Sequence, residues 1–186
     1  MNAELPRISS NERPLIRNAV SSDVSAIASL IPAAITLLQN DFLTPAEITS
    51  SRAIMGIDTR LIDDGTYFVA EIDGELAGCG GWSRRRMLYG ADATTGRDDS
   101  PLDPAVDAAR IRAMYTHPKH ARKGIARSIL AMSEAAARAE GFTRMEFVST
   151  LAGVPLYLAC GYEMGERFSD ATGGVPVPLV RMAKRL

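Results

Sequence analysis

Apolar and polar residues alternate along this chain with two periods, and these periods predict helices and strands in turn. The helical period is clearest at Ile125, Ile129, Met132 and Ala136, which recur at i, i+4, i+7 and i+11 on one helix face. Short apolar runs of strand length lie on both sides of this helix. The other predicted elements are, in order, strand 15–20, a helix from 22 or 23, helix 44–56, strands 66–72, 75–83, 111–116 and 144–149, helix 156–160, and strands 163–168 and 177–184.

Start and turn signals support several of these elements. Thr44-Pro45-Ala46-Glu47 is a capping box with proline at the first helical position, and Asp73-Gly74 between two apolar runs is a strong hairpin signal. Ser22 or Asp23 caps the first helix, whose pattern is disturbed by Pro32. We therefore predict one α/β domain over residues 15–186, preceded by a flexible polar tail at residues 1–14.

Residues 84–108 form a long insertion between the third and fourth predicted strands. An insertion of this length is either a solvated surface loop or a functional flap over a substrate site. In the second interpretation Arg84 and Arg85, which open an arginine triplet, hold an anionic group of the substrate. Trp82 lies at the base of the insertion and is either a core residue or a platform for the substrate.

A basic turn at residues 117–124 joins the fourth strand to the helix that follows. The amides of a helix's first turn lack partners within the helix, and the helix dipole adds roughly half a positive charge there. Arg122, Lys123 and Arg127 surround this helix start with full charges, and Gly124 stands at its tightest point. The segment predicts a binding site for a phosphate-containing ligand.

The spacing of the turn excludes two common phosphate motifs and matches a third. Neither G-x-x-x-x-G-K-[ST] nor an early G-x-G-x-x-G occurs in the chain. The turn resembles motif A of the GCN5-related N-acetyltransferase (GNAT) superfamily, in which [QR]-x-x-G-x-[GA] holds the pyrophosphate of acetyl-CoA. Gly124 and Ala126 fit the last two positions, whereas Ala121 departs from the family's Gln or Arg.

A second GNAT resemblance follows at the spacing that the fold requires. Leu156-Tyr157-Leu158-Ala159-Cys160-Gly161-Tyr162 is similar to the family's L-Y-x-x-x-G-[FY] segment. The matching motifs cover residues 109–162, and the order of predicted elements extends the resemblance from about Leu15 to the C-terminus. The resemblance implies an α/β (α+β) GNAT fold with a mixed, mostly antiparallel sheet of about seven strands and about four flanking helices.

The resemblance also implies where acetyl-CoA binds and how the thiol leaves. Tyr157 stands at the family's tyrosine position and is expected to protonate the departing thiolate. A backbone N–H of the fourth strand is expected to polarise the thioester carbonyl. The residues implied in binding acetyl-CoA are Met114, Tyr115, Thr116, Ala121, Arg122, Lys123, Gly124, Ile125, Ala126 and Arg127.

The general base that takes the proton from the acceptor is not identified by the motifs. Some GNAT enzymes carry a glutamate fourteen residues before the motif glycine, but this chain has Arg110 there. Glu71 on the second strand and Glu146 on the fifth are the candidate acids nearby, and a chain of water molecules is a further option. Strand alternation does not show which of the two glutamates faces the site.

Composition fits an ordinary soluble enzyme. The chain has 186 residues, is 46% apolar and carries a formal net charge of −1, which argues against a nucleic-acid-binding surface. Cys79 and Cys160 lie far apart without metal-ligand spacing, so we expect neither a disulfide framework nor a metal site. No apolar run is expected to span a membrane, and the polar N-terminus lacks a signal-peptide core, which favours the cytoplasm.

Together these observations predict an acetyl-CoA-dependent N-acetyltransferase. The acetyl group would pass directly to a small-molecule or peptide amine in a ternary complex, without nucleic acid, membrane or metal. A homodimer is compatible with the family, whose members are often dimers. One alternative is a non-catalytic acyl-CoA sensor with the same fold, favoured by Arg110; another is a nucleotide-binding protein of unrelated fold.

Overall fold

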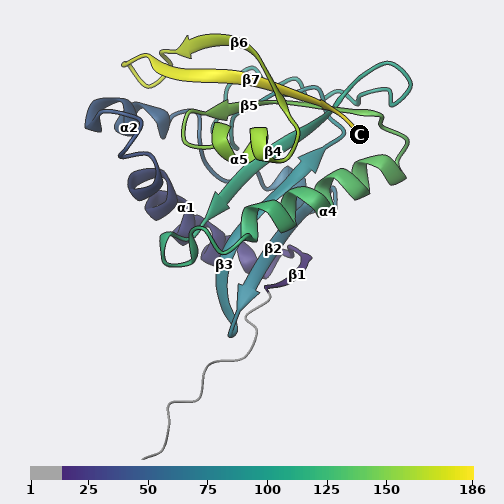
Figure 1. Ribbon diagram of the computed structural model, residues 1–186, viewed down its shortest axis with the longest axis horizontal. Helices are drawn as coiled ribbons and strands as arrows, with labels where there is room; N and C mark the ends of the chain where they lie inside the picture. The colour runs from purple at the N-terminus through teal and green to yellow at the C-terminus, as the bar shows by residue number, and fades with distance from the viewer. Residues whose placement is uncertain (1–13) are drawn as a thin grey trace, which may run out of the picture.

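A single sheet runs through the domain, and its strands follow the predicted order. The computed structural model describes residues 14–186, so the predicted tail lies outside the described residues except for Pro14. The described chain forms one seven-stranded sheet of order β1-β2-β3-β4-β5-β7-β6, in which β4 and β5 are parallel and all other neighbours antiparallel (Figure 1). The strands are β1 (Leu15–Asn18), β2 (Tyr67–Ile72), β3 (Glu75–Ser83), β4 (Ala109–Thr116), β5 (Arg144–Thr150), β6 (Glu163–Asp170) and β7 (Val177–Arg185).

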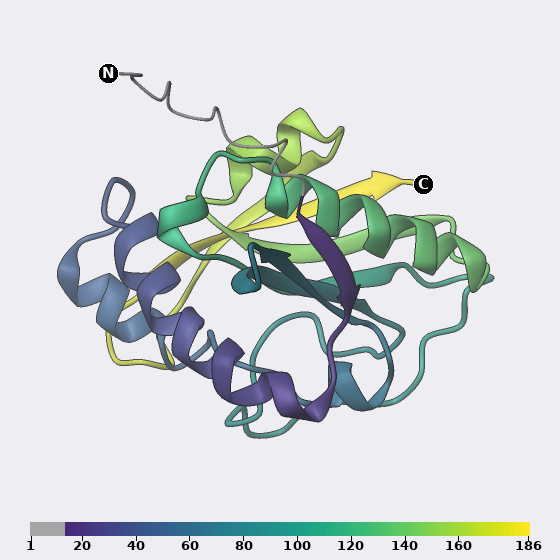
Figure 2. The same ribbon diagram turned by 90° about the horizontal axis from the view of Figure 1, so that it is seen from below.

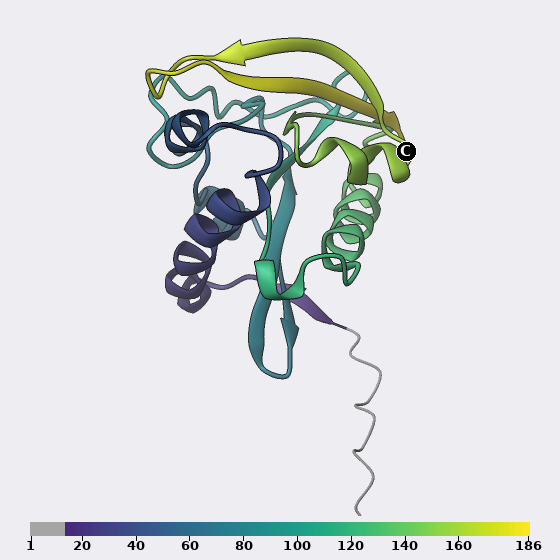
Figure 3. The same ribbon diagram turned by 60° about the vertical axis from the view of Figure 1, so that its left-hand side comes forward.

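Helices cover both faces of this sheet. Figures 2 and 3 show α1 and α2 on one face and α4 and α5 on the other. The described residues contain five α-helices, one more than expected, because α3 is a single turn and too short to give a periodic pattern. The helices are α1 (Val24–Leu38), α2 (Pro45–Ser51), α3 (Arg60–Asp63), α4 (Ile125–Ala139) and α5 (Val154–Ala159), with short 3-10 turns η1 (Ser21–Asp23) and η2 (Pro118–His120).

The long helix α4 packs against β3 and β4, but its buried face is rotated from the predicted one. Ile125 and Ile129 are buried as expected, whereas Met132 is 36% exposed. The buried face continues instead through Ser133 and Ala137, both without exposed surface. The polar Ser133 can be buried on this face because its hydroxyl donates a hydrogen bond to the Ile129 carbonyl of the same helix, at 3.0 Å. A pattern based on apolar residues alone does not predict this position as buried.

Helix α1 buries the predicted face and continues through Pro32. Ile27, Leu30, Ile31 and Ile35 are all buried against the sheet. By length and composition alone, Ser21–Leu38 could also cross a membrane, with a mean hydropathy of 1.5. The expectation that no apolar run reaches this length is therefore wrong for this segment, although core helices of soluble proteins share such composition.

Strands β4 and β5 pair over a short stretch and then separate. Their parallel register includes only two pairs, Ala109 with Met145 and Arg110 with Glu146. Beyond these pairs β4 stays bonded to β3, while β5 stays bonded to β7 along its whole length. The backbone groups on the facing edges of β4 and β5 are thus left without strand partners in the middle of the sheet.

The insertion between β3 and β4, residues 84–108, folds against the domain and is held by a buried ion cluster. The Asp58 carboxylate accepts from the Arg112 guanidinium at 2.8 Å and from the Arg97 guanidinium at 3.0 Å. Arg112 also donates to the Met87 carbonyl at 3.0 Å. The Asp58 and Arg112 side chains are only 1% and 3% exposed. The cluster connects the insertion to β4 and to the segment before α3.

We predict that Asp58→Ala destabilises the protein by about 3–5 kcal/mol, because it leaves the Arg112 charge buried without its partner. Urea denaturation measures this loss. Glu75→Ala is the matched control, since Glu75 pairs with Lys119 where both side chains are about two-thirds exposed, and it should leave the midpoint unchanged. A loss below about 1 kcal/mol for Asp58→Ala would contradict a structural role for the cluster.

Candidate active site

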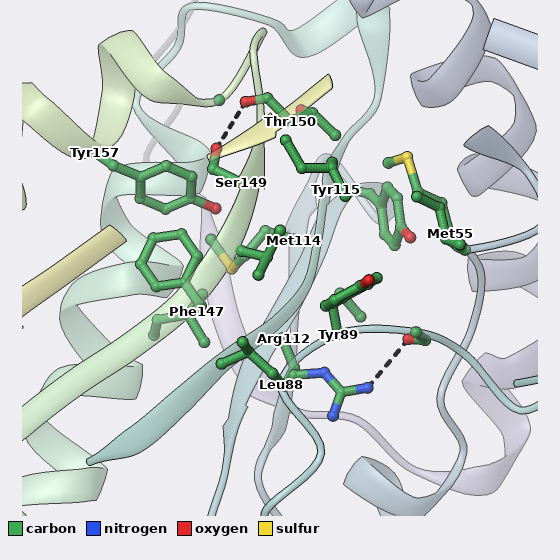
Figure 4. Close-up of a pocket in the computed structure, with 17 residues that line it drawn as sticks. Met55, Leu88, Tyr89, Arg112, Met114, Tyr115, Phe147, Ser149, Thr150 and Tyr157 are labelled. Atoms are coloured by element: carbon green, nitrogen blue, oxygen red, sulfur yellow. Dashed lines mark hydrogen bonds between the residues drawn. The ribbon is translucent and has the colours of Figure 1, made fainter. Parts of the chain in front are cut away.

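A cavity of about 130 Å³ occupies the gap between β4 and β5. Residues 111–115 of β4 form one wall and residues 147–150 of β5 form another. Residues 88–90 of the insertion also line it, as does Tyr157 of α5. Figure 4 shows the Tyr157 and Phe147 rings on one side of the cavity and the Tyr115 and Met55 side chains on the other. The walls of the cavity are therefore formed by segments that are distant in sequence.

A bulge in β4 shapes the wall of this cavity. The β3–β4 register shifts between Cys79 and Gly81, and Ala113 has a positive φ of 48°. The Tyr67 hydroxyl donates to the Ala113 carbonyl at 2.7 Å and holds the bulge from the other side. A Cβ at Gly80 would lie 2.1 Å from Met114 Sδ and 3.2 Å from Met114 Cα, so any larger residue opposite the bulge would force Met114 to move.

The bulged strand directs backbone amides into the gap. The His117 amide donates to the Ala77 carbonyl of β3 at 2.9 Å. Because successive backbone groups of a regular strand point to opposite edges, the Thr116 amide faces the edge where β5 has separated. At the bulge, the Met114 N–H points opposite to the Ala113 carbonyl of the same planar peptide, and so away from the Tyr67 hydroxyl. That a fourth-strand N–H polarises a carbonyl bound in the gap stays a prediction.

The basic turn lies at the end of β4 and leads into α4. Arg122 and Gly124 both have positive φ, at 66° and 81°, and α4 begins directly afterwards at Ile125. A Cβ at Gly124 would meet no atom within 4 Å, so glycine is required here by the backbone conformation rather than by lack of space.

The turn and the start of α4 contain buried side chains and several exposed basic ones. Ile125, included among the predicted acetyl-CoA ligands, is 1% exposed and packs in the core, so only its backbone can contribute. Ala121 and Ala126 are half-buried. Arg122, Lys123 and Arg127 have exposed side chains around the helix start, as an anion site requires.

Tyr157 presents its hydroxyl to the cavity from a fixed ring. The ring packs edge-on against Phe147, with centroids 4.4 Å apart, and against Tyr162 at 5.8 Å. A Cβ at Gly153 would lie 2.9 Å from the ring, so this glycine permits the packing. Figure 4 shows the hydroxyl pointing inward to the side of the cavity where Met114 lies. Burial raises the pKa of Tyr157 well above its ordinary value, so the phenol stays protonated at neutral pH.

The two glutamates proposed as general bases do not line the cavity. Glu71 accepts from the Arg17 guanidinium at 2.5 Å, at the β1–β2 edge. Glu146 lies between Arg110 and Arg181, at 2.9 and 3.1 Å. Strand position suggested both, but their side chains are held by arginines outside the site.

The residues at the insertion that were predicted to bind the substrate do not line the cavity either. Trp82 is 1% exposed and packs edge-on against Phe142, which makes it a core residue. Arg84 pairs with Glu140 at 2.8 Å. Arg85 forms a two-pronged ion pair with Asp64, with both N–O distances 2.6 Å. The insertion does reach the cavity, but through residues 88–90 rather than through its arginines.

Several cavity residues gave no signal in the sequence. Tyr89 lies in a loop without periodicity, and Met55 follows α2 in a short connection. From the sequence alone, Arg112 would be predicted to face solvent on its strand. In the structure it is buried with its partner Asp58. Tyr115, by contrast, was predicted at the cofactor site, and its ring lines the cavity while its hydroxyl bonds the Gly56 backbone at 2.9 and 3.2 Å.

Comparison with known proteins agrees with this geometry. The family model described as acetyltransferase (GNAT) family matches residues 32–162, more than half of the chain, so the chain belongs to the GNAT family of acetyltransferases. The predicted family, fold class and enzyme class are thus confirmed. The search of curated proteins found no match.

Solved structures share the fold at low sequence identity. A GCN5-related N-acetyltransferase from Rhodopseudomonas palustris is 17% identical, with a TM-score of 0.68 over 93% of this chain and 96% of that one. The PaiA N-acetyltransferase from Thermoplasma acidophilum, in complex with coenzyme A, is 12% identical, with a TM-score of 0.63 over 94% and 99%. An acetyltransferase from Salmonella typhimurium, with its cofactor acetyl-CoA, is 19% identical, with a TM-score of 0.63 over 94% of each chain.

We predict that Gly124→Val weakens CoA binding tenfold or more, or about 1.4 kcal/mol, because a branched side chain disfavours the positive φ and reorients the turn's amides. Isothermal titration calorimetry measures the dissociation constant. Gly96→Val is the matched control: Gly96 also has a positive φ and open space, but it lies in the insertion and does not line the cavity. An unchanged affinity in a folded Gly124→Val variant would contradict the assigned turn.

Proposed function

We propose that this GNAT enzyme transfers the acetyl group of acetyl-CoA directly to an amine, in a complex that holds both substrates. The carrying observation is the gap between β4 and β5, which has the basic turn beside it and the Tyr157 hydroxyl inside it. The pyrophosphate would bind at the start of α4, and the pantetheine arm would run along the free edge of β4. The acetyl group would then lie in the cavity.

In this arrangement three groups of the chain act on the thioester. The Met114 and Thr116 amides are available to hydrogen-bond the carbonyl oxygen as negative charge develops on it. Tyr157 would give its proton to the departing sulfur. Burial disfavours a thiolate as well as a phenolate, so the desolvation that raises the phenol's pKa also makes the sulfur a better proton acceptor.

The cavity favours an enzyme over a non-catalytic acyl-CoA sensor. A sensor needs the turn and the free strand edge, but it has no need for a hydroxyl directed at the sulfur's expected position. The Tyr157 ring is held in place by Phe147, Tyr162 and Gly153, which makes its direction a consequence of packing. Arg110, which raised the sensor alternative, pairs with Glu146 outside the cavity.

We predict that Tyr157→Phe lowers kcat by roughly a hundredfold or more, because it removes the proton donor and retains the ring. CoA affinity should change little. A thiol-release assay with acetyl-CoA and the best amine acceptor measures the rate.

The control for this variant is Tyr162→Phe, which removes a hydroxyl from the adjacent ring. Tyr162 does not line the cavity, so its variant should keep the parental kcat. Parental turnover in Tyr157→Phe would show that solvent protonates the thiolate. A lower melting temperature with turnover retained would reduce Tyr157 to a packing residue.

A further inference from the structure

The cavity presents few groups that exchange protons. Its described lining contains four titratable side chains, Tyr89, Arg112, Tyr115 and Tyr157, and no carboxylate. Acetyl transfer to an amine nevertheless requires a group that accepts the proton of the attacking nitrogen. The group that takes this proton must therefore be one of these side chains, a group hydrogen-bonded to one of them, or solvent.

Three of the four side chains already have hydrogen-bond partners or an assigned role. The Tyr115 hydroxyl both accepts from the Gly56 amide and donates to the Gly56 carbonyl. The Arg112 guanidinium is a permanent cation held by Asp58 and two backbone carbonyls. Tyr157 is assigned to the leaving sulfur. Tyr89 is left.

Tyr89 differs from the others because it has a carboxylate behind its hydroxyl. The hydroxyl donates to Asp170 Oδ2 at 2.8 Å, and the ring lies against Phe168, with centroids 6.1 Å apart. Asp170 ends β6, so this contact joins the insertion to the β6–β7 hairpin across 81 residues of sequence. A phenol hydroxyl that donates its hydrogen bond to a carboxylate keeps its oxygen lone pairs available to accept a hydrogen bond from an amine.

The surroundings of Asp170 keep it ionised. Partial burial acts to raise the pKa of Asp170, but hydrogen bonds from Thr172 and Tyr89 outweigh burial and lower it. The Thr172 amide donates to Oδ1 at 2.7 Å and fixes the carboxylate's orientation. Oδ2 is thus directed at the Tyr89 hydroxyl. The carboxylate is charged at neutral pH and is hydrogen-bonded to Tyr89, a residue that lines the cavity.

We propose that Tyr89 and Asp170 form the relay that carries the proton away from the acceptor amine; this inference rests on the proposed acetyl transfer. The amine nitrogen bonds to the thioester carbon, and its proton passes to the Tyr89 oxygen as the Tyr89 proton passes to Asp170. The carbon–sulfur bond then breaks, and Tyr157 protonates the sulfur. Asp170 releases its proton to water, and Tyr157 regains one from water, so the balance closes without a further reactant.

Two single variants and their combination test the relay. Tyr89→Phe removes the hydroxyl and retains the ring, and Asp170→Asn removes the charge while keeping the size. Each should lower kcat by about a hundredfold and leave the dissociation constant of CoA unchanged. The double variant should be no more than about threefold slower than the slower single variant, because residues acting as one unit are not additive.

The probes are acetyl-CoA with tyramine, spermidine and glycinamide, and the readout is thiol release. Ser50→Ala is the matched structural control: the Ser50 hydroxyl donates to the Val175 carbonyl at 2.5 Å and so anchors the same β6–β7 turn from outside the cavity. It should lower the melting temperature and keep the parental kcat.

The outcomes separate this inference from the proposed function. Parental kcat in Tyr89→Phe or in Asp170→Asn, with a parent enzyme that turns over, would overturn the relay alone. Losses that multiply in the double variant would show that Tyr89 and Asp170 act independently, which would overturn the relay. An equal loss of kcat in Ser50→Ala would show that Tyr89 only anchors the hairpin. A folded parent that binds CoA but acetylates none of the amines would overturn the proposed function, and the relay with it.

Discussion

The separation of β4 from β5 is the feature on which the rest of the site depends. Strands of a sheet normally pair along their length, because unpaired backbone groups in a protein interior are costly. Here the pairing ends after Arg110 and Glu146. The bulge at Ala113, held by the Tyr67 hydroxyl, changes the course of β4 while β4 keeps its bonds to β3. The free edge that results is a row of hydrogen-bonding groups suited to an extended ligand such as pantetheine.

The remaining elements close the cavity around that edge. On the β5 side, the ring of Tyr157 is fixed by its aromatic neighbours. On the opposite side, Tyr115 bonds Gly56. Arg112 of β4 secures the insertion by donating to the Met87 and Gly90 carbonyls. The insertion is then joined to the β6–β7 hairpin by Tyr89 and Asp170. Contacts that stabilise the fold therefore also determine which side chains line the cavity.

Local patterns in the sequence were enough to predict the sheet, the order of elements and the basic turn. Tyr157 could be placed because a short motif surrounds it. The chemistry opposite Tyr157 could not be predicted, because it depends on contacts between segments far apart in the chain. Tyr89 lies in an aperiodic loop, and only the folded chain brings it to Asp170.

The candidate glutamates show the converse limitation. Glu71 and Glu146 have a suitable residue type on suitable strands, but alternation alone does not reveal a partner. Glu71 is paired with Arg17, and Glu146 with Arg110 and Arg181, and neither carboxylate lines the cavity. A single sequence carries no signal of such pairings, since a strand arginine is equally consistent with a solvated surface.

A crystal structure of the protein with bound CoA would test the central claim most directly, namely that the gap between β4 and β5 is the acetyl-CoA site. The account predicts the pyrophosphate at the amides that begin α4, the pantetheine amides paired with the free edge of β4, and the thiol within hydrogen-bonding distance of the Tyr157 hydroxyl. CoA bound elsewhere, or a thiol directed away from the cavity with β4 and β5 still separated, would contradict it.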